Sequence, residues 1–157
     1  MQAYGPAVLR LGLGAVFVAH GAQKLLGVWG GLGLAGTAQS LANLHFPAVM
    51  PLAVLVAVVE LAGGIMLILG ALTRYVALAL AIEMAVALWE VHLPNGFFIN
   101  WGLEPGIGHG YEFNMTLIAA LISMTLTGPG AFSIDAWRAR SAEAEAYGRA
   151  RLRAGKV

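Results

Sequence analysis

The chain has 157 residues, of which 59% are hydrophobic and 11% charged, and its formal net charge is +1. Because a soluble globular domain has about a quarter of its residues charged, this composition excludes an ordinary soluble protein and indicates one integral membrane domain. The near-neutral charge gives no support for nucleic-acid binding. The absence of cysteine excludes disulfide, thiolate and iron–sulfur chemistry by this chain alone.

Residues 6–26 predict the first membrane span, an apolar helix that begins with Pro6 in its first turn. One face of this helix combines basic, titratable and small residues, namely Arg10, Gly14, Phe17, His20, Gly21 and Lys24. Such a face favours contact with other helices. The alternative is that Arg10 and Lys24 extend to the two membrane surfaces.

A glycine-rich connection, residues 27–47, follows the first span. Within it, Thr37 predicts the cap of a short helix over residues 38–46, which is too short to span and is expected to lie along the membrane interface.

The second predicted span, residues 48–72, has a single charge, Glu60, at its centre. A carboxylate there is disfavoured by about 2.5–3.5 kcal/mol, so Glu60 is expected to face other helices. The helical stripe that it shares with Ala53, Ala57 and Gly64 supports this prediction, because membrane helices pack closely through small residues.

Residues 75–92 predict a third span with a stripe formed by Ala79, Glu83, Val86 and Glu90. The following segment, residues 93–110, has two prolines, five glycines and the aromatic residues Phe97, Phe98 and Trp101. It is either an interfacial anchor or a lid over the mouth of the bundle.

The fourth predicted span, residues 111–127, has a polar and small stripe formed by Glu112, Thr116, Ala119, Ala120, Ser123 and Thr127. Residues 1–130 are therefore predicted to form an all-α bundle of four spans, and residues 131–157 a polar tail. From Asp135 to Lys156 this tail has six basic and three acidic residues. The positive-inside rule predicts that both termini and the tail are cytoplasmic, with the aromatic loop outside.

Burial of these stripes would bring Glu60 and Glu83 to mid-depth. It would also gather His20, Lys24, Glu90, His92 and Glu112 in the outer half, with His109 above them.

Three functions of these groups compete. Histidine titrates near neutral pH, so the groups could exchange protons with a quinone or quinol. His20, His92, His109 and a carboxylate could ligate a metal, but their spacing disfavours it. The charges could instead only pair, Lys24 with Glu90 or Glu112 and Arg10 with Glu83.

The pattern Arg10, Gly14, Phe17, His20-Gly21 and Lys24-Leu25 resembles the first-helix signature of the DoxX family, and Glu60, Gly63-Gly64, Leu69-Gly70 and Thr73 resemble its second. The resemblance covers about residues 6–136. It implies a four-helix protein of the bacterial inner membrane. DoxD relatives are subunits of a thiosulfate:quinone oxidoreductase, and some DoxX proteins are described as parts of oxidoreductase complexes in oxidative-stress defence. The matching polar positions are Arg10, His20, Lys24, Glu60 and Glu112.

We therefore expect a membrane subunit of an oxidoreductase system that handles protons at a quinone site, with no metal or haem. Its partners would be the lipid bilayer, redox enzymes and a second copy of the chain. The expected proton-handling residues are His20, Glu60 and Glu112, and the expected binding residues are Arg10, Lys24, Glu83, Glu90, His92, Phe97, Phe98, Trp101 and His109. The alternatives are a non-catalytic anchor that recruits redox proteins and, third, a carrier of protons or small solutes.

Overall fold

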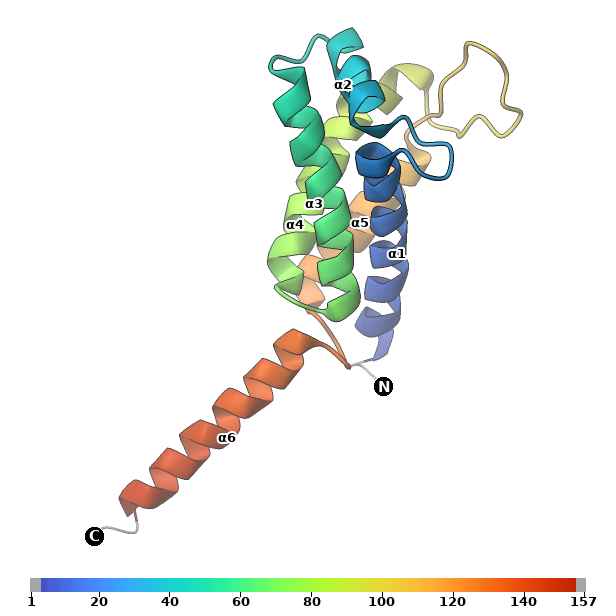
Figure 1. Ribbon diagram of the computed structural model, residues 1–157. Helices are drawn as coiled ribbons and strands as arrows, with labels where there is room; N and C mark the ends of the chain where they lie inside the picture. The colour runs from blue at the N-terminus through green and yellow to red at the C-terminus, as the bar shows by residue number, and fades with distance from the viewer. Residues whose placement is uncertain (1–3, 155–157) are drawn as a thin grey trace.

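The computed structural model describes residues 4–154, which are all-helical and contain no strand (Figure 1). Residues 1–3 and 155–157 lie outside the described residues, and Lys156 of the predicted tail is among them. The helices are α1 (Tyr4–Leu26), α2 (Gly33–Asn43), α3 (Val49–Leu69), α4 (Thr73–Ala87), α5 (Glu112–Thr127) and α6 (Ile134–Ala154).

Within residues 4–154, three helices are long and apolar enough to cross a membrane: α1, α3 and the continuous helical segment Thr73–Asn95. Beyond α4 this last segment continues through a π-helical turn, Leu88–His92, and a short 3₁₀ turn, Leu93–Asn95. Helix α5 is also apolar but has only 16 residues, a length of about 24 Å, against a hydrocarbon core of about 30 Å. It packs beside α4 in the same bundle, and its role as a fourth span stays a prediction.

Helices α1 and α3 touch through their backbones. A Cβ atom added to Gly21 would lie 2.3 Å from the Leu61 nitrogen, and one added to Gly64 would lie 2.6 Å from the Val18 nitrogen. This contact explains the glycine in the small-residue stripe of α3, since a Cβ atom at Gly64 would clash with the backbone of α1. Ala53, Ala57, Glu60 and Gly64 are all buried, which confirms the predicted inward face of the second span.

Larger side chains fill the space between the α1–α3 pair and the α4–α5 pair. The centre of this core is formed by Leu13, Phe17, Leu67, Leu80, Leu121 and Met124. Glu83 is half-buried, whereas Ala79, Val86 and Glu90 of the predicted α4 stripe are exposed, and the fully buried face of α4 includes Ala77, Leu80 and Met84 instead.

The prediction that the polar stripe of the fourth span faces the bundle was wrong. Thr116, Ser123 and Thr127 are exposed, while α5 buries Asn114, Leu117, Leu121 and Met124. The threonine hydroxyls do not need the bundle because they donate to carbonyl oxygens one turn earlier, at 2.9 Å from Thr116 to Glu112 and 2.7 Å from Thr127 to Ser123.

The short helix after the first span also differs from its prediction. It begins at Gly33 rather than at residue 38, and it ends at Asn43. Thr37 therefore lies inside the helix and does not cap it, since its hydroxyl donates to the Gly33 carbonyl at 2.8 Å. Helix α2 packs against α3 and α1, so it forms part of the wall at one end of the bundle (Figure 1).

Arg10 neither extends to the membrane surface nor pairs with Glu83, as the sequence had suggested. Its side chain is buried, and the guanidinium donates to four carbonyl oxygens at 2.9–3.2 Å, two at the end of α3 and two in the loop before α6 (Leu67, Ile68, Ala131 and Phe132). Arg10 thus holds together three chain segments at the end of the bundle where α1 begins.

Asp135 caps the N-terminus of α4 from the first turn of α6. Its carboxylate accepts hydrogen bonds from the Leu72 and Thr73 backbone nitrogens at 2.9 and 2.8 Å and from the Thr73 hydroxyl at 2.9 Å. Burial by itself opposes ionisation, but these hydrogen bonds and the charge of Arg138 outweigh it and hold the pKa of Asp135 below its ordinary value.

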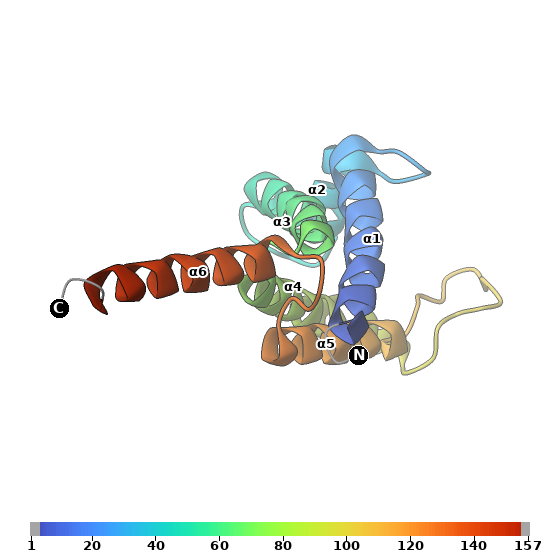
Figure 2. The ribbon, with the colours of Figure 1, turned by 90° about the horizontal axis from the view of Figure 1, so that it is seen from below.

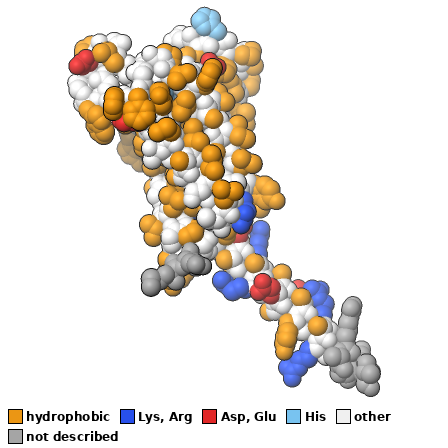
Figure 3. Space-filling view, turned by 180° about the vertical axis from the view of Figure 1, so that it is seen from behind, with side chains coloured by type: hydrophobic (Ala, Val, Ile, Leu, Met, Phe, Trp, Pro, Cys, Tyr) orange, Lys and Arg blue, Asp and Glu red, His pale blue; other side chains and the backbone are white. Residues whose placement is uncertain are grey.

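Beyond its first turns, α6 projects away from the bundle in two perpendicular views (Figure 1, Figure 2). Figure 3 shows hydrophobic side chains over the height of the bundle, whereas Lys and Arg gather at its lower end and along α6. Exposed apolar side chains on a bundle of this composition are suited to contact with lipid. The distribution of basic residues supports the orientation with cytoplasmic termini, which stays a prediction together with the division at residue 130.

Candidate functional site

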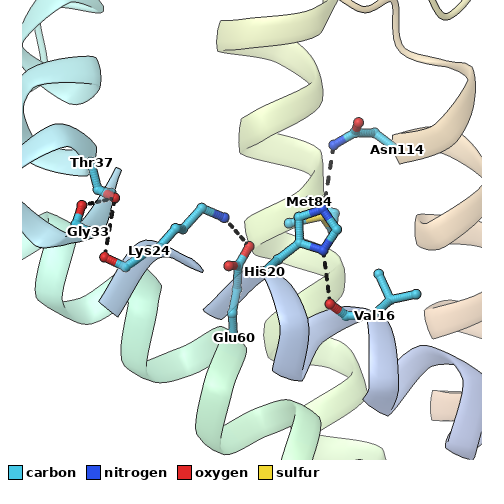
Figure 4. A network of polar contacts seen from close by, with 8 residues as sticks. All are labelled: Val16, His20, Lys24, Gly33, Thr37, Glu60, Met84 and Asn114. Carbon is cyan, nitrogen blue, oxygen red and sulfur yellow. Dashed lines mark hydrogen bonds and ion pairs between the residues drawn. The ribbon is translucent and has the colours of Figure 1, made fainter. Parts of the chain in front are cut away.

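Glu60 forms an ion pair with Lys24 inside the bundle (Figure 4). The Lys24 ammonium lies 2.5 Å from Oε1 of Glu60, and the side chains are 32% and 2% exposed, respectively. The second carboxylate oxygen, Oε2, is buried without a hydrogen-bond partner among the described residues. Lys24 therefore pairs with Glu60, and not with Glu90 or Glu112 as the sequence had suggested.

A cavity of about 490 Å³, here called the histidine cavity, opens beside this ion pair. Helices α1, α4 and α5 and the loop before α5 form most of its wall. Its polar and titratable lining consists of His20, Lys24, Glu60, His92, His109 and Asn114, and its apolar lining includes Phe17, Met84, Ile99, Trp101 and Phe113. The volume is within the range of small-molecule sites, about 300–1,000 Å³.

Two of the histidines are held in a defined orientation by backbone carbonyls. Nδ1 of His20 lies 2.9 Å from the Val16 oxygen, and Nδ1 of His92 lies 2.9 Å from the His109 oxygen. Because a carbonyl oxygen only accepts, each Nδ1 is assigned the proton, which leaves Nε2 of a neutral ring as a hydrogen-bond acceptor. These rings are therefore suited to accept a proton from a bound hydroxyl group.

A second cavity of about 590 Å³, here called the Glu83 cavity, lies between α2, α3 and α4. It shares Lys24, Glu60 and His92, together with Met84 and Ala87, with the histidine cavity, so the ion pair lines both spaces. Glu83 and Glu90 line only the Glu83 cavity, and both carboxylate oxygens of Glu83 are buried without a partner among the described residues. The predicted cluster of charges is thus divided between two cavities.

The aromatic loop, residues 93–110, lines the histidine cavity with only some of its side chains, and its role as an anchor or as a lid stays a prediction. Ile99, Trp101 and His109 form part of the wall of the histidine cavity, as a lid would. Phe97 instead makes edge contacts with Phe98 and Tyr111, with ring centres 5.1 and 5.3 Å apart. Neither Phe97 nor Phe98 lines either cavity.

Residues 5–93 of the chain, more than half of its length, match the DoxX family. The chain belongs to the DoxX family. This confirms the resemblance seen in its first two spans, and with the apolar helices it makes the chain a multi-pass protein of the bacterial inner membrane.

Curated relatives of this DoxX chain align over most of their own length. It is 29% identical over 131 residues to "Putative oxidoreductase CatD" of Bacillus subtilis, covering 83% of this chain and 84% of that protein. It is 32% identical over 144 residues to "Uncharacterized membrane protein Rv3486" of Mycobacterium tuberculosis, covering 86% and 83%. It is 29% identical over 137 residues to "Inner membrane protein YqjF" of Escherichia coli, covering 86% and 92%. No solved structure matches the chain significantly.

Besides Phe97 and Phe98, two more of the residues expected at the site of this DoxX protein, Arg10 and Glu112, line neither cavity. Arg10 is at the other end of α1, where its guanidinium binds carbonyl oxygens. Glu112 accepts a hydrogen bond at 2.9 Å from the Ile99 nitrogen, and it therefore fastens the aromatic loop to α5.

Sequence reasoning missed Asn114, Met84, Thr37 and Ser40 as cavity residues. Asn114 is buried at the histidine cavity, and its amide nitrogen lies 3.8 Å from the Met84 sulfur (Figure 4). A single amide side chain in an apolar helix could have indicated Asn114. The prediction relied on the polar stripe of the fourth span instead, and Asn114 lies on the opposite face. Within residues 4–154 no group of three or more His, Asp or Glu side chains is arranged to hold a metal ion.

Proposed function

We propose that this DoxX protein is the membrane subunit of a quinone-linked oxidoreductase system and that the histidine cavity binds the quinone or quinol ring. The observation that supports this most is the position of the Lys24–Glu60 ion pair, which lies at the wall of an apolar cavity beside His20 and His92. The cavity combines apolar contact area with hydrogen-bonding groups of both kinds, which a ring with polar oxygens requires.

Each of these groups has a distinct role in the proposal. The Lys24 ammonium donates a hydrogen bond to a quinone oxygen, and Nε2 of His20 or His92 accepts one from a quinol hydroxyl. Oxidation of a quinol releases two protons and two electrons, so the site needs proton acceptors and an electron acceptor. The histidines and Glu60 accept the protons. Since the chain has no cysteine, the electrons pass to a redox group of a partner protein.

Ligand-dependent stabilisation tests the proposal. A ligand that binds only the folded protein raises its free energy of unfolding, by about 2.7 kcal/mol at one hundred times its Kd. We expect an oxidised or reduced short-chain quinone to raise the melting temperature of the purified protein in detergent. His20→Gln and Glu60→Gln should reduce this shift.

A matched histidine variant controls for unspecific effects. His45 is exposed and lies outside both cavities, and asparagine tolerates its left-handed backbone, with φ at +62°. His45→Asn should therefore leave the quinone shift unchanged. Equal melting temperatures with and without both quinone forms in the wild-type protein would remove the basis of the proposal.

Helix α6 favours a second candidate, a non-catalytic anchor that recruits a soluble redox protein. It projects from the bundle over most of its length, and its exposed side chains include Trp137, Arg138, Arg140, Tyr147 and Arg149. Shortening the chain after Arg140 keeps the Asp135 cap but removes most of this arm. Loss of a co-purifying partner, with an unchanged quinone shift, would support the anchor; retention of every partner would contradict it.

A further inference from the structure

The Glu83 cavity has an apolar wall, and most of the charged groups that line it are acidic. Helices α2, α3 and α4 supply aliphatic side chains such as Leu41, Leu52, Val59, Ile82 and Val86 to its wall. Its volume, about 590 Å³, is sufficient for a drug-sized molecule. The proposed quinone site lies in the histidine cavity, which shares the ion pair with this space but is also lined by His20 and Asn114, neither of which lines this space.

The charged groups of this cavity do not balance one another. Among the described residues, three carboxylic acids line it, Glu60, Glu83 and Glu90, and the only Lys or Arg in its lining is Lys24. Lys24 is already bonded to Glu60, whose second oxygen remains buried and unpartnered, as are both oxygens of Glu83 within the described residues. A buried carboxylate without a partner is costly, so these oxygens favour either a proton or a positively charged ligand.

The geometry points to a binding site for lipophilic cations in the Glu83 cavity. The apolar body of the ligand contacts the aliphatic walls, and its positive centre lies against the carboxylate of Glu83, with Glu60 and Glu90 adding negative charge. A proton and the cation compete for the same carboxylate. Of the other titratable groups that line the cavity, Lys24 is already paired with Glu60, and Nδ1 of His92 is bonded to the His109 carbonyl.

A pair of probes with similar shape and opposite charge tests this site. Tetraphenylphosphonium and tetraphenylborate are both apolar ions, and their binding to the purified full-length protein in detergent can be measured by equilibrium dialysis. We expect saturable binding of the phosphonium, weaker at pH 5 than at pH 8. The borate should bind at least about tenfold more weakly, because like charges repel in a site of low polarity.

Two variants separate Glu83 from the other acidic residues. Glu83→Gln keeps the shape of the side chain and should weaken phosphonium binding about tenfold or more, because it removes one partner of a buried charge pair. It should also reduce the pH dependence of phosphonium binding. Glu104→Gln removes an exposed carboxylate that lines neither cavity, so it should leave the binding unchanged.

The inference is overturned if the wild-type protein binds both probes equally or binds neither. It is also overturned if Glu83→Gln binds the phosphonium as tightly as the wild-type protein while remaining folded, as judged by its melting temperature. The result is separable from the quinone proposal. Glu83→Gln should keep the quinone-dependent shift, and His20→Gln should keep phosphonium binding, so either proposal can fail alone.

Discussion

Replacement of Lys24 by methionine should destabilise the protein strongly, because it leaves Glu60 as a buried charge without a counter-ion. Breaking a buried ion pair by removing one partner typically costs about 3–5 kcal/mol. Lys24 is partly exposed, so the loss of its own favourable interactions is small, and the main cost is the charge stranded on Glu60. We expect a loss of about 3 kcal/mol in the free energy of unfolding.

Replacement of Glu60 by glutamine should lower the free energy of unfolding less than replacement of Lys24 by methionine. In Glu60→Gln the amide oxygen still accepts a hydrogen bond from Lys24, whose ammonium retains access to water, so the expected loss is about 1 kcal/mol. The double variant Lys24→Met/Glu60→Gln buries no charge. Its loss should therefore be smaller, by about 2 kcal/mol, than the sum of the two single losses.

Unfolding by SDS in mixed micelles measures all three variants against the wild-type protein. Two results would refute this reasoning: losses that add within about 0.5 kcal/mol, or equal losses in the two single variants.

Three further predictions concern other parts of the bundle and use the same assay. Gly21→Ala places a Cβ 2.3 Å from the Leu61 nitrogen and should lower the free energy of unfolding by about 2 kcal/mol, whereas Gly12→Ala, with nothing within 4 Å, should leave it unchanged or raise it by up to about 1 kcal/mol. Asp135→Ala should cost about 1 kcal/mol through loss of the α4 cap, and a cost near zero would contradict that role. Since the pKa of Asp135 is held below its ordinary value of 3.8, the stability that this group contributes is present above pH 3.8 and lost as the pH falls through the lower, folded-state pKa; Asp135→Asn should flatten that part of the pH profile. Arg10→Met should cost about 3 kcal/mol, because it removes the four hydrogen bonds by which the buried guanidinium joins three chain segments, and full stability in this variant would show that water replaces the guanidinium.

The helices and the burial of Glu60 could be predicted from the sequence, because strong local signals fix both. Apolar runs of sufficient length define the spans, and a single carboxylate in a span has one acceptable direction to face. The small residues beside Glu60 identified that direction correctly, since they also mark where α1 and α3 meet.

The face of α5 could not be predicted in the same way. Small and hydroxyl-bearing residues suit either a helix contact or a lipid-facing surface, since a hydroxyl such as that of Thr116 can bond to its own helix. The partner of Lys24 was missed for a related reason. A lysine side chain reaches more than one helical turn from its Cα atom, so depth along the span does not identify which carboxylate it meets.

The two cavities have no signal in the sequence at all. A cavity is what remains after helices of fixed shape have packed, and it depends on contacts between distant segments such as α2 with α3 and the aromatic loop with α5. The π-helical turn at Leu88–His92 is a further reason that the cavities could not be predicted, because it changes the direction of the His92 side chain relative to a regular helix. Placement of His92 at both cavities therefore required the three-dimensional structure.

The glycine contact between α1 and α3 also limits how this protein can move. Backbones that already touch cannot approach further, and the interlocked pair behaves as one rigid body. Any swelling or shrinking of either cavity must then come from displacement of α4 and α5, or of α2 and the aromatic loop, against that fixed frame. When spectroscopic labels are attached in pairs, the distances should change strongly between the α1–α3 pair and the α4–α5 pair. The distance between a label on α1 and one on α3 should change little.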